Sequence, residues 1–251
     1  MSQFPTLLRH WRKQRRLSQL DLALDANVSA RHLSFLETGR AQPSPGMILQ
    51  LSDALDLPLD ARNALFVATG YAPRYPSRPL TDDAMAPVLS AVRRMLDTHA
   101  PYPGLAMDRL WTIQMMNPAA RMLFAPLGMQ EGASLLDLFR NPLMPQIVEN
   151  WPQVAHHSAT RLRAESLAAG GISELEDAAR ALFELAERDS APSDGPVIPV
   201  TYRLNDLRLS LFGTIAQFST IADSTLDDLK IELFFPADEA SAATLEALAN
   251  A

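Results

Sequence analysis

A short proline-rich segment constrains the architecture of this chain more than any other feature. Pro73, Pro76 and Pro79 fall close together, and because proline lacks a backbone N–H and clashes with the preceding turn, no regular helix can pass through them. Apolar residues recur with a helical period before this segment, whereas period-two alternation occurs only beyond it. The length of 251 residues also favours two domains. We therefore predict an N-terminal domain, a semi-rigid linker and a C-terminal domain at residues 1–70, 71–83 and 84–251.

The first of these regions has the pattern of a compact all-helical domain. Serine precedes three of its periodic apolar segments, as expected of an N-cap, at positions Ser18, Ser29 and Ser44. Gly39 and Gly70 stand where helices should stop. We expect five short helices, at 5–16, 19–26, 30–37, 45–56 and 59–69.

The second region mixes strand and helix patterns. Periodicity predicts a helix from Asp83 to Thr98 and a mostly helical stretch from Asn117 to Ala186. Alternation predicts strands at 105–107, at 111–115 after a turn at Asp108-Arg109, from 197, at 207–211 after a turn at Asn205-Asp206, and at 231–235. Five strands with helices inserted after the second indicate an α+β domain, in which helices partly cover one antiparallel sheet.

Composition excludes several kinds of chemistry. The chain has no cysteine, which removes disulfides, thiolate zinc sites, iron–sulfur clusters and cysteine nucleophiles. The adjacent pair His156-His157 would point about 100° apart on a helix, so the two imidazoles cannot share a metal. No nucleotide-binding or hydrolase motif is present. We therefore expect no metal, no catalytic residue and no enzyme.

The distribution of charge points to an anionic partner. The net charge is −7, yet residues 1–40 hold seven Lys or Arg against three Asp or Glu. A basic head on an acidic body suggests a polyanion-binding module, although a solvated basic helix face would explain it equally well. The chain has neither an apolar run of about 18 residues nor a secretory signal pattern, so we expect a cytoplasmic protein outside the membrane.

Residues 19–38 have the spacing of a helix-turn-helix. Ala23 is small where the second helix must approach the first, and Asn27 occupies the turn position that needs a positive φ. Val28, Leu33 and Leu36 supply the buried side of the pair. Two helices packed without a role in DNA binding would need the same apolar set. The basic first helix and the small or polar outer face of 30–37 favour DNA binding.

These motifs resemble known families. The first half is similar to the lambda-repressor-like (Cro/C1, or XRE) DNA-binding domain through Leu17-Ser18-Gln19-Leu20-Asp21-Leu22-Ala23 and Leu33-Ser34, Leu36-Glu37 and Gly39-Arg40. The string Ser29–Arg40 with Gly70-Tyr71-Ala72-Pro73 resembles MmyB-like bacterial transcription regulators. Their ligand-binding domain is matched by Pro101-Tyr102-Pro103, Asp108-Arg109 with Trp111, Asn117 with Ala119-Ala120, and Phe234-Phe235-Pro236-Ala237-Asp238. The resemblance spans about residues 5–245 and implies a PAS-like C-terminal domain that accepts a fatty-acid-like ligand.

The first domain then offers specific DNA contacts. The outward residues at the start of a recognition helix reach base edges in the major groove, which here are Ala30, Arg31, His32 and Ser34. Arg31 is the strongest candidate, because its guanidinium can bond guanine O6 and N7 together, although a phosphate contact is its alternative. Phosphate contacts are predicted for Gln19, Ser29, Arg40 and Ser44. The resemblance implies that Arg12 and Glu37 form an internal ion pair.

The second domain offers an apolar interior. Methionine suits a pocket for a flexible ligand but also fills ordinary cores, and six methionines lie between residues 107 and 144. The predicted pocket residues are Met107, Trp111, Ile113, Met115, Met122, Phe124, Phe212, Phe218 and Phe234. A bound fatty acid would need a partner for its carboxylate, and the candidates are Arg109, Arg121, Arg163 and His157.

The sequence thus predicts a DNA-binding transcription regulator that acts on a double-stranded operator. We expect a homodimer on an inverted repeat, since protein symmetry matches operator symmetry. The C-terminal domain senses a small apolar ligand, dimerises, or does both. Two alternatives stay open: a ligand-free dimerisation module, and an enzyme with a DNA-binding appendage.

Overall fold

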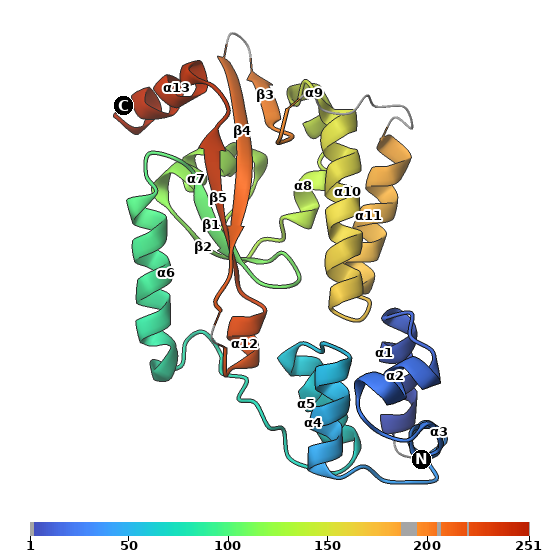
Figure 1. The fold of residues 1–251 in the computed structure, drawn as a ribbon. Coiled ribbons are helices and arrows are strands. Elements are labelled where there is room, and N and C mark those ends of the chain that lie inside the picture. The colour runs from blue at the N-terminus through green and yellow to red at the C-terminus, as the bar shows by residue number, and fades with distance from the viewer. Residues whose placement is uncertain (1–2, 187–194, 205–206, 220, 251) are drawn as a thin grey trace. The chain divides into compact units, whose positions relative to one another are not determined.

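The chain divides into two compact units (Figure 1). The computed structural model describes residues 3–186, 195–204, 207–219 and 221–250. Unit 1 consists of Met1–Arg78 with Ser166–Ile172 and Thr220–Asp227, the last of which contains α12 (Ser224–Asp227). Unit 2 consists of Pro79–Glu165, Ser173–Ser219 and Asp228–Ala251. The first change of unit therefore falls between Arg78 and Pro79, inside the segment predicted as a linker.

Unit 1 contains the five helices that the sequence predicts. They are α1 (Phe4–Gln14), α2 (Gln19–Asp25), α3 (Ala30–Glu37), α4 (Pro45–Ala54) and α5 (Leu59–Ala68). The side chains of Ser18, Ser29 and Ser44 accept hydrogen bonds from the backbone N–H groups three residues later, which confirms all three as N-caps. Each helix contributes its apolar stripe to one core, so packing rather than propensity holds these short helices.

The connection between α2 and α3 fixes their mutual orientation. Asn27 has a φ of 48°, as predicted, and the backbone N–H of Val28 donates to Ala23 O at 2.8 Å. Ala23 and Leu33 are buried where the two helices meet. Gly39 lies two residues after α3 ends, at a φ of 72°, a region that glycine enters without steric cost.

Unit 2 is built on a five-stranded antiparallel sheet, as predicted. The strands are β1 (Gly104–Met107), β2 (Ile113–Met116), β3 (Val200–Leu204), β4 (Leu207–Ala216) and β5 (Lys230–Pro236), in the order β2-β1-β5-β4-β3. Strand β1 pairs with both β2 and β5, and its four residues are all buried. The sheet therefore places the last of the described strands, β5, beside the first, β1.

Helices cover both faces of this sheet. Figure 1 shows α6 (Ala86–Thr98) on one side and α10 (Trp151–Ala168) with α11 (Ser173–Leu185) on the other. The shorter elements are η1 (Asp83–Met85), α7 (Pro118–Phe124), η2 (Ala125–Leu127), α8 (Leu136–Arg140) and α9 (Met144–Ile147). Within the described residues, no helix combines the length and apolarity needed to span a bilayer.

Buried Asn117 ties three of these elements together. Its Oδ1 accepts the backbone N–H groups of Ala120 and Gly104. Its Nδ2 donates to the carbonyls of Leu96 and Tyr102. The residue predicted to open a helix is thus also the link between α6, β1 and α7.

The structure corrects several boundaries. Trp111 lies outside β2, at a φ of 63°, because the turn after β1 is longer than the Asp108-Arg109 pair. The third strand begins at Val200 and not at Val197, since Pro199 cannot donate to a ladder. The predicted turn at 205–206 lies outside the described residues. A final helix, α13 (Glu239–Ala249), was not predicted; Leu245 packs it against Leu209 and Leu211.

Candidate functional site

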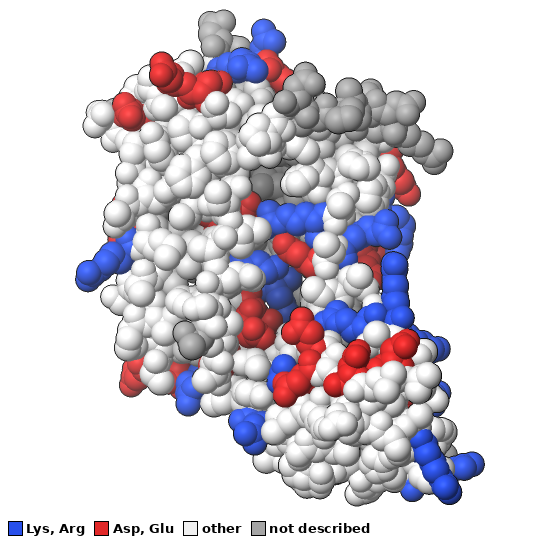
Figure 2. Space-filling model, in the orientation of Figure 1, with Lys and Arg blue, Asp and Glu red and all other residues white. Residues whose placement is uncertain are grey.

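The outward face of α3 is the first candidate site. Ala30 and Arg31 are exposed and His32 and Ser34 are half-buried, whereas the helix buries its opposite side. The Arg31 guanidinium lies 5.4 Å above the centre of the Phe35 ring. This contact reduces the freedom of the arginine before it meets a partner. Figure 2 shows basic side chains projecting at the lower right, where Figure 1 draws α3.

A buried carboxylate holds α1, α2 and α3 together behind that face. Glu37 accepts two hydrogen bonds from the Arg12 guanidinium, at 2.6 and 2.9 Å, and a third from Gln19 Nε2 at 2.7 Å. Burial by itself would raise the pKa of Glu37, but these bonds hold that pKa below its usual value. Arg9 donates to the Glu37 carbonyl. The arrangement orients α3 and uses one N–H group of the half-buried Gln19 side-chain amide, which leaves the second N–H group for another acceptor.

The phosphate candidates occupy helix N-termini and their surroundings. The Oγ atoms of Ser29 and Ser44 accept capping bonds, which leaves each hydroxyl hydrogen able to donate to a phosphate oxygen. Both serines and Arg40 are exposed, and Gln19 is half-buried at the start of α2. The backbone N–H groups of the first turn add a positive field there.

Unit 2 contains the second candidate site, a cavity of about 510 Å³ between the sheet and α10. On α10 it is lined by Trp151, Val154, Ser158 and Arg161, at intervals of three or four positions, and by His157 next to Ser158, so these residues occupy one helix face about 15 Å long. Most of the wall is apolar. The lining comprises Trp111, Phe124, Leu135, Leu138, Phe139, Met144, Trp151, Val154, His157, Ser158, Arg161, Gly195, Pro196, Val197, Ile198, Val200, Tyr202, Leu211, Phe212, Gly213, Glu232 and Phe234.

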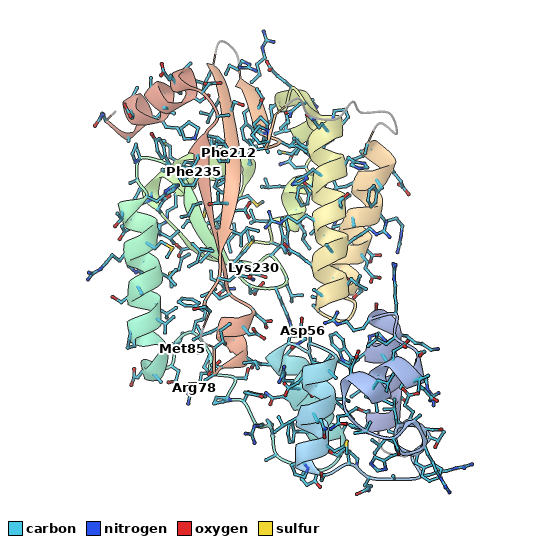
Figure 3. The ribbon with its side chains drawn as sticks, in the orientation of Figure 1. Asp56, Arg78, Met85, Phe212, Lys230 and Phe235 are labelled. Carbon is cyan, nitrogen blue, oxygen red and sulfur yellow. The ribbon has the colours of Figure 1, made fainter. Side chains whose placement is uncertain are left out.

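The predicted pocket residues divide between this cavity and other places. Trp111, Phe124, Phe212 and Phe234 line the cavity, and Phe212 also stacks on Phe235 at 5.7 Å (Figure 3). The remaining five do not line it: Met107 and Ile113 are buried in the core, Met115 and Phe218 are half-buried, and Met122 is exposed. Of the six methionines in the predicted cluster, Met144 lines the cavity.

An ion-pair array that the sequence did not reveal reaches the cavity wall through Arg161 and Glu232. Arg161 donates from Nε to Glu165 at 2.9 Å and from both terminal nitrogens to Glu232, at 3.0 and 3.1 Å. Lys230 donates to Glu165 at 2.7 Å. Although burial opposes it, the pairing with Lys230 and Arg161 lowers the pKa of Glu165. Figure 3 shows Lys230 where β5 begins.

Trp111 joins this array to the apolar wall. Its indole Nε1 donates to Glu165 at 2.8 Å, and the Arg161 guanidinium lies 4.4 Å from the ring centre. The Asp108 carboxylate holds the preceding turn by accepting the backbone N–H groups of Leu110 and Thr112. A tryptophan at positive φ costs backbone energy, and such strain concentrates at functional sites. The turn therefore places the indole at a position that alternation along a strand would not give.

The arginines predicted to hold a ligand carboxylate lie away from the cavity. Arg109 pairs with Asp228 at 3.6 Å, Arg121 pairs with Glu131 at 2.7 Å, and Arg163 lies over the Phe183 ring. His157 does line the cavity. Burial and the Arg161 charge lower the pKa of His157, which favours a neutral imidazole. Among the described lining residues the permanently charged cation is Arg161, whose sequence signal is its i,i+4 spacing from Glu165.

Comparisons with known proteins match one family model to each half of the chain. No curated protein matches the chain. Residues 8–61, which hold α2 and α3, match the helix-turn-helix family model. Residues 88–248, well over half of the chain, match the MmyB-like transcription regulator ligand binding domain. With a helix-turn-helix unit preceding that domain, the chain belongs to the family of MmyB-like transcription regulators of the XRE type.

Proposed function

We propose that this DNA-binding regulator recognises a specific operator through α3 and senses a small apolar molecule, such as a fatty acid, in the cavity of unit 2. The observation that supports this most strongly is the cavity of about 510 Å³, a size typical of small-molecule sites. A chain buried against its apolar wall gains about 0.8 kcal/mol per CH₂. A PAS-like description of unit 2 is supported by its five-stranded antiparallel sheet with helices inserted after the second strand.

On the DNA side, Arg31 reads base edges while Ser29, Ser44, Arg40 and Gln19 contact phosphates. The exposure of Arg31 and its position in the first turn of α3 support this division. The protein acts in the cytoplasm as a homodimer on an inverted repeat. The ligand shifts an equilibrium between two dimer geometries, of which one spaces the recognition helices by about 34 Å.

The alternatives to a sensor are less well supported. A ligand-free dimerisation module would favour a filled interior, and the cavity argues against one. An enzyme would use carboxylates poised to exchange protons, whereas the Glu165 carboxylate is ion-paired with a lowered pKa. The ion-pair array is better suited to shaping a binding wall.

Two experiments on the full-length protein test the proposal. Native mass spectrometry followed by organic extraction should find a bound lipid, or added lipids should raise the melting temperature. In vitro selection from random duplexes should return a palindromic site. A protein that neither carries nor takes up an apolar ligand would leave the dimerisation module as the better account, and selection of a non-palindromic site would contradict the symmetric dimer.

A further inference from the structure

In the described part of the chain, the charges of the ion-pair array beside the cavity balance one another. Arg161 from α10 and Lys230 from β5 face the carboxylates of Glu165 and Glu232, two positive groups against two negative ones. The side chains of all four are largely buried. The other titratable groups in the wall are His157 on α10 and Tyr202 on β3. Burial raises the pKa of Tyr202, and partial burial together with the nearby Arg161 charge lowers that of His157, so the neutral form of each is favoured.

We propose that the cavity binds an amphiphile whose polar end is uncharged in the complex: an alcohol, an ester, an amide or the protonated form of an acid. This inference rests on the proposed function, namely that the cavity holds a small molecule with an apolar chain. It concerns the head group, which decides what the sensor discriminates.

Among the residues of this wall that the structure describes, a bound carboxylate would meet no unpaired cation. If it stayed beside the array it would add a third negative charge next to largely buried side chains, where an unpaired ion is costly. If it took Arg161, it would have to displace Glu232, which is 8% exposed. Glu232 also packs tightly against β4, because a Cβ on Gly213 would lie 2.8 Å from its Oε1. Both routes disfavour the anion.

The same wall suits a neutral acceptor. Arginine has five N–H donors, and Arg161 uses three of them on Glu165 and Glu232. In the part of the chain that the structure describes, the other two N–H groups of Arg161 have no acceptor, so they can donate to a ligand oxygen. The Ser158 hydroxyl and the His157 imidazole lie one turn away on the same face of α10 and also line the cavity. A carbonyl or hydroxyl oxygen can therefore bond here without adding charge.

A matched series with one chain length tests this. Dissociation constants of dodecanol, methyl dodecanoate, dodecanamide and dodecanoate are measured for the full-length protein by calorimetry, below their aggregation limits. At pH 7.5 the three neutral compounds should bind at least about tenfold more tightly than dodecanoate. A simple carboxyl group titrates near pH 4–5, so dodecanoate should strengthen by about tenfold for each unit that the pH falls from 8 to 6. Dodecanol should not change with pH.

Substitution of one carboxylate should reverse the preference. Glu232→Gln keeps an acceptor for Arg161 but leaves the array with one excess positive charge, so dodecanoate should gain at least about tenfold relative to dodecanol. Glu246→Gln on the exposed face of α13 is the matched control and should leave the ratio unchanged. Wild-type protein that binds dodecanoate as tightly as dodecanol, independently of pH, would overturn the inference. Binding of no compound in the series would instead contradict the proposed function.

Discussion

Arg12 and Glu37 form a bidentate ion pair, with Nε–Oε1 and terminal nitrogen–Oε2 distances of 2.6 and 2.9 Å, inside the core of unit 1. The side chain of Glu37 is 1% exposed and that of Arg12 is 12% exposed. A buried ion pair stabilises the fold little more than two well-packed apolar side chains would. Removal of one partner, however, is strongly destabilising, because it leaves the other charge buried and unpaired. The ion pair therefore joins α1 to α3 and holds α3 in position.

The first prediction concerns the stability of unit 1. Glu37→Ala should lower the free energy of unfolding by about 3 kcal/mol, because Arg12 and Gln19 both lose their partner. Asp53→Ala is the matched control: Asp53 pairs with Arg62 at the surface, and exposed pairs contribute about 0–1 kcal/mol. Urea unfolding followed by circular dichroism measures both. Equal losses in the two variants would contradict a structural role for Glu37.

The second prediction concerns pH. The pKa of Glu37 in the folded state lies below its unfolded value, so its contribution to stability is present above the unfolded pKa, near 4.3. That contribution is lost as the pH falls through the folded pKa. Glu37→Gln should therefore show a flatter dependence of melting temperature on pH below about 4.5 than the wild type. If the melting temperatures of the two proteins fall in parallel as the pH decreases, protonation of Glu37 does not contribute to acid unfolding.

The third prediction separates base reading from phosphate contact. Arg31→Ala should weaken binding to a selected operator by about 1–3 kcal/mol and relax the preference at one base pair. Gln19→Ala should weaken all sequences alike. Arg74→Ala removes another exposed arginine, outside α3, and serves as the control. Fluorescence anisotropy with single-base operator variants measures each effect. If Arg31→Ala loses the same affinity for every operator variant, Arg31 contacts a phosphate and does not read a base.

The fourth prediction uses the backbone of Trp111. At a φ of 63° a residue with a Cβ costs about 1–2 kcal/mol, whereas glycine does not. Trp111→Gly should therefore be more stable than Trp111→Ala by about 1 kcal/mol, although both lose the indole. Phe183 lies in the helix α11, so there the alanine variant should be the more stable by a similar amount. Thermal melts of the four variants test whether the turn is strained.

The helical first unit was largely predictable because its signals are local. A serine cap, a residue at positive φ and a glycine stop are each decided within four residues, as Ser29, Asn27 and Gly39 illustrate. Five strands were also recognisable from alternation. The boundaries that failed, at Trp111 and Val200, lie where a turn or a proline breaks the alternation.

The cavity was only partly predictable, because its chemistry depends on distant residues. Arg161 and Glu232 are 71 positions apart, and they meet because β5 inserts between β1 and β4. Methionine content gave no guide either: Met144 lines the cavity, while Met107 is in the core and Met122 is exposed. The sequence by itself determined the helix caps, the recognition helix and the number of strands, since neighbouring residues set backbone conformation. Only the tertiary structure decided which charged groups share the cavity wall, since strand pairing brings together residues that no local pattern relates.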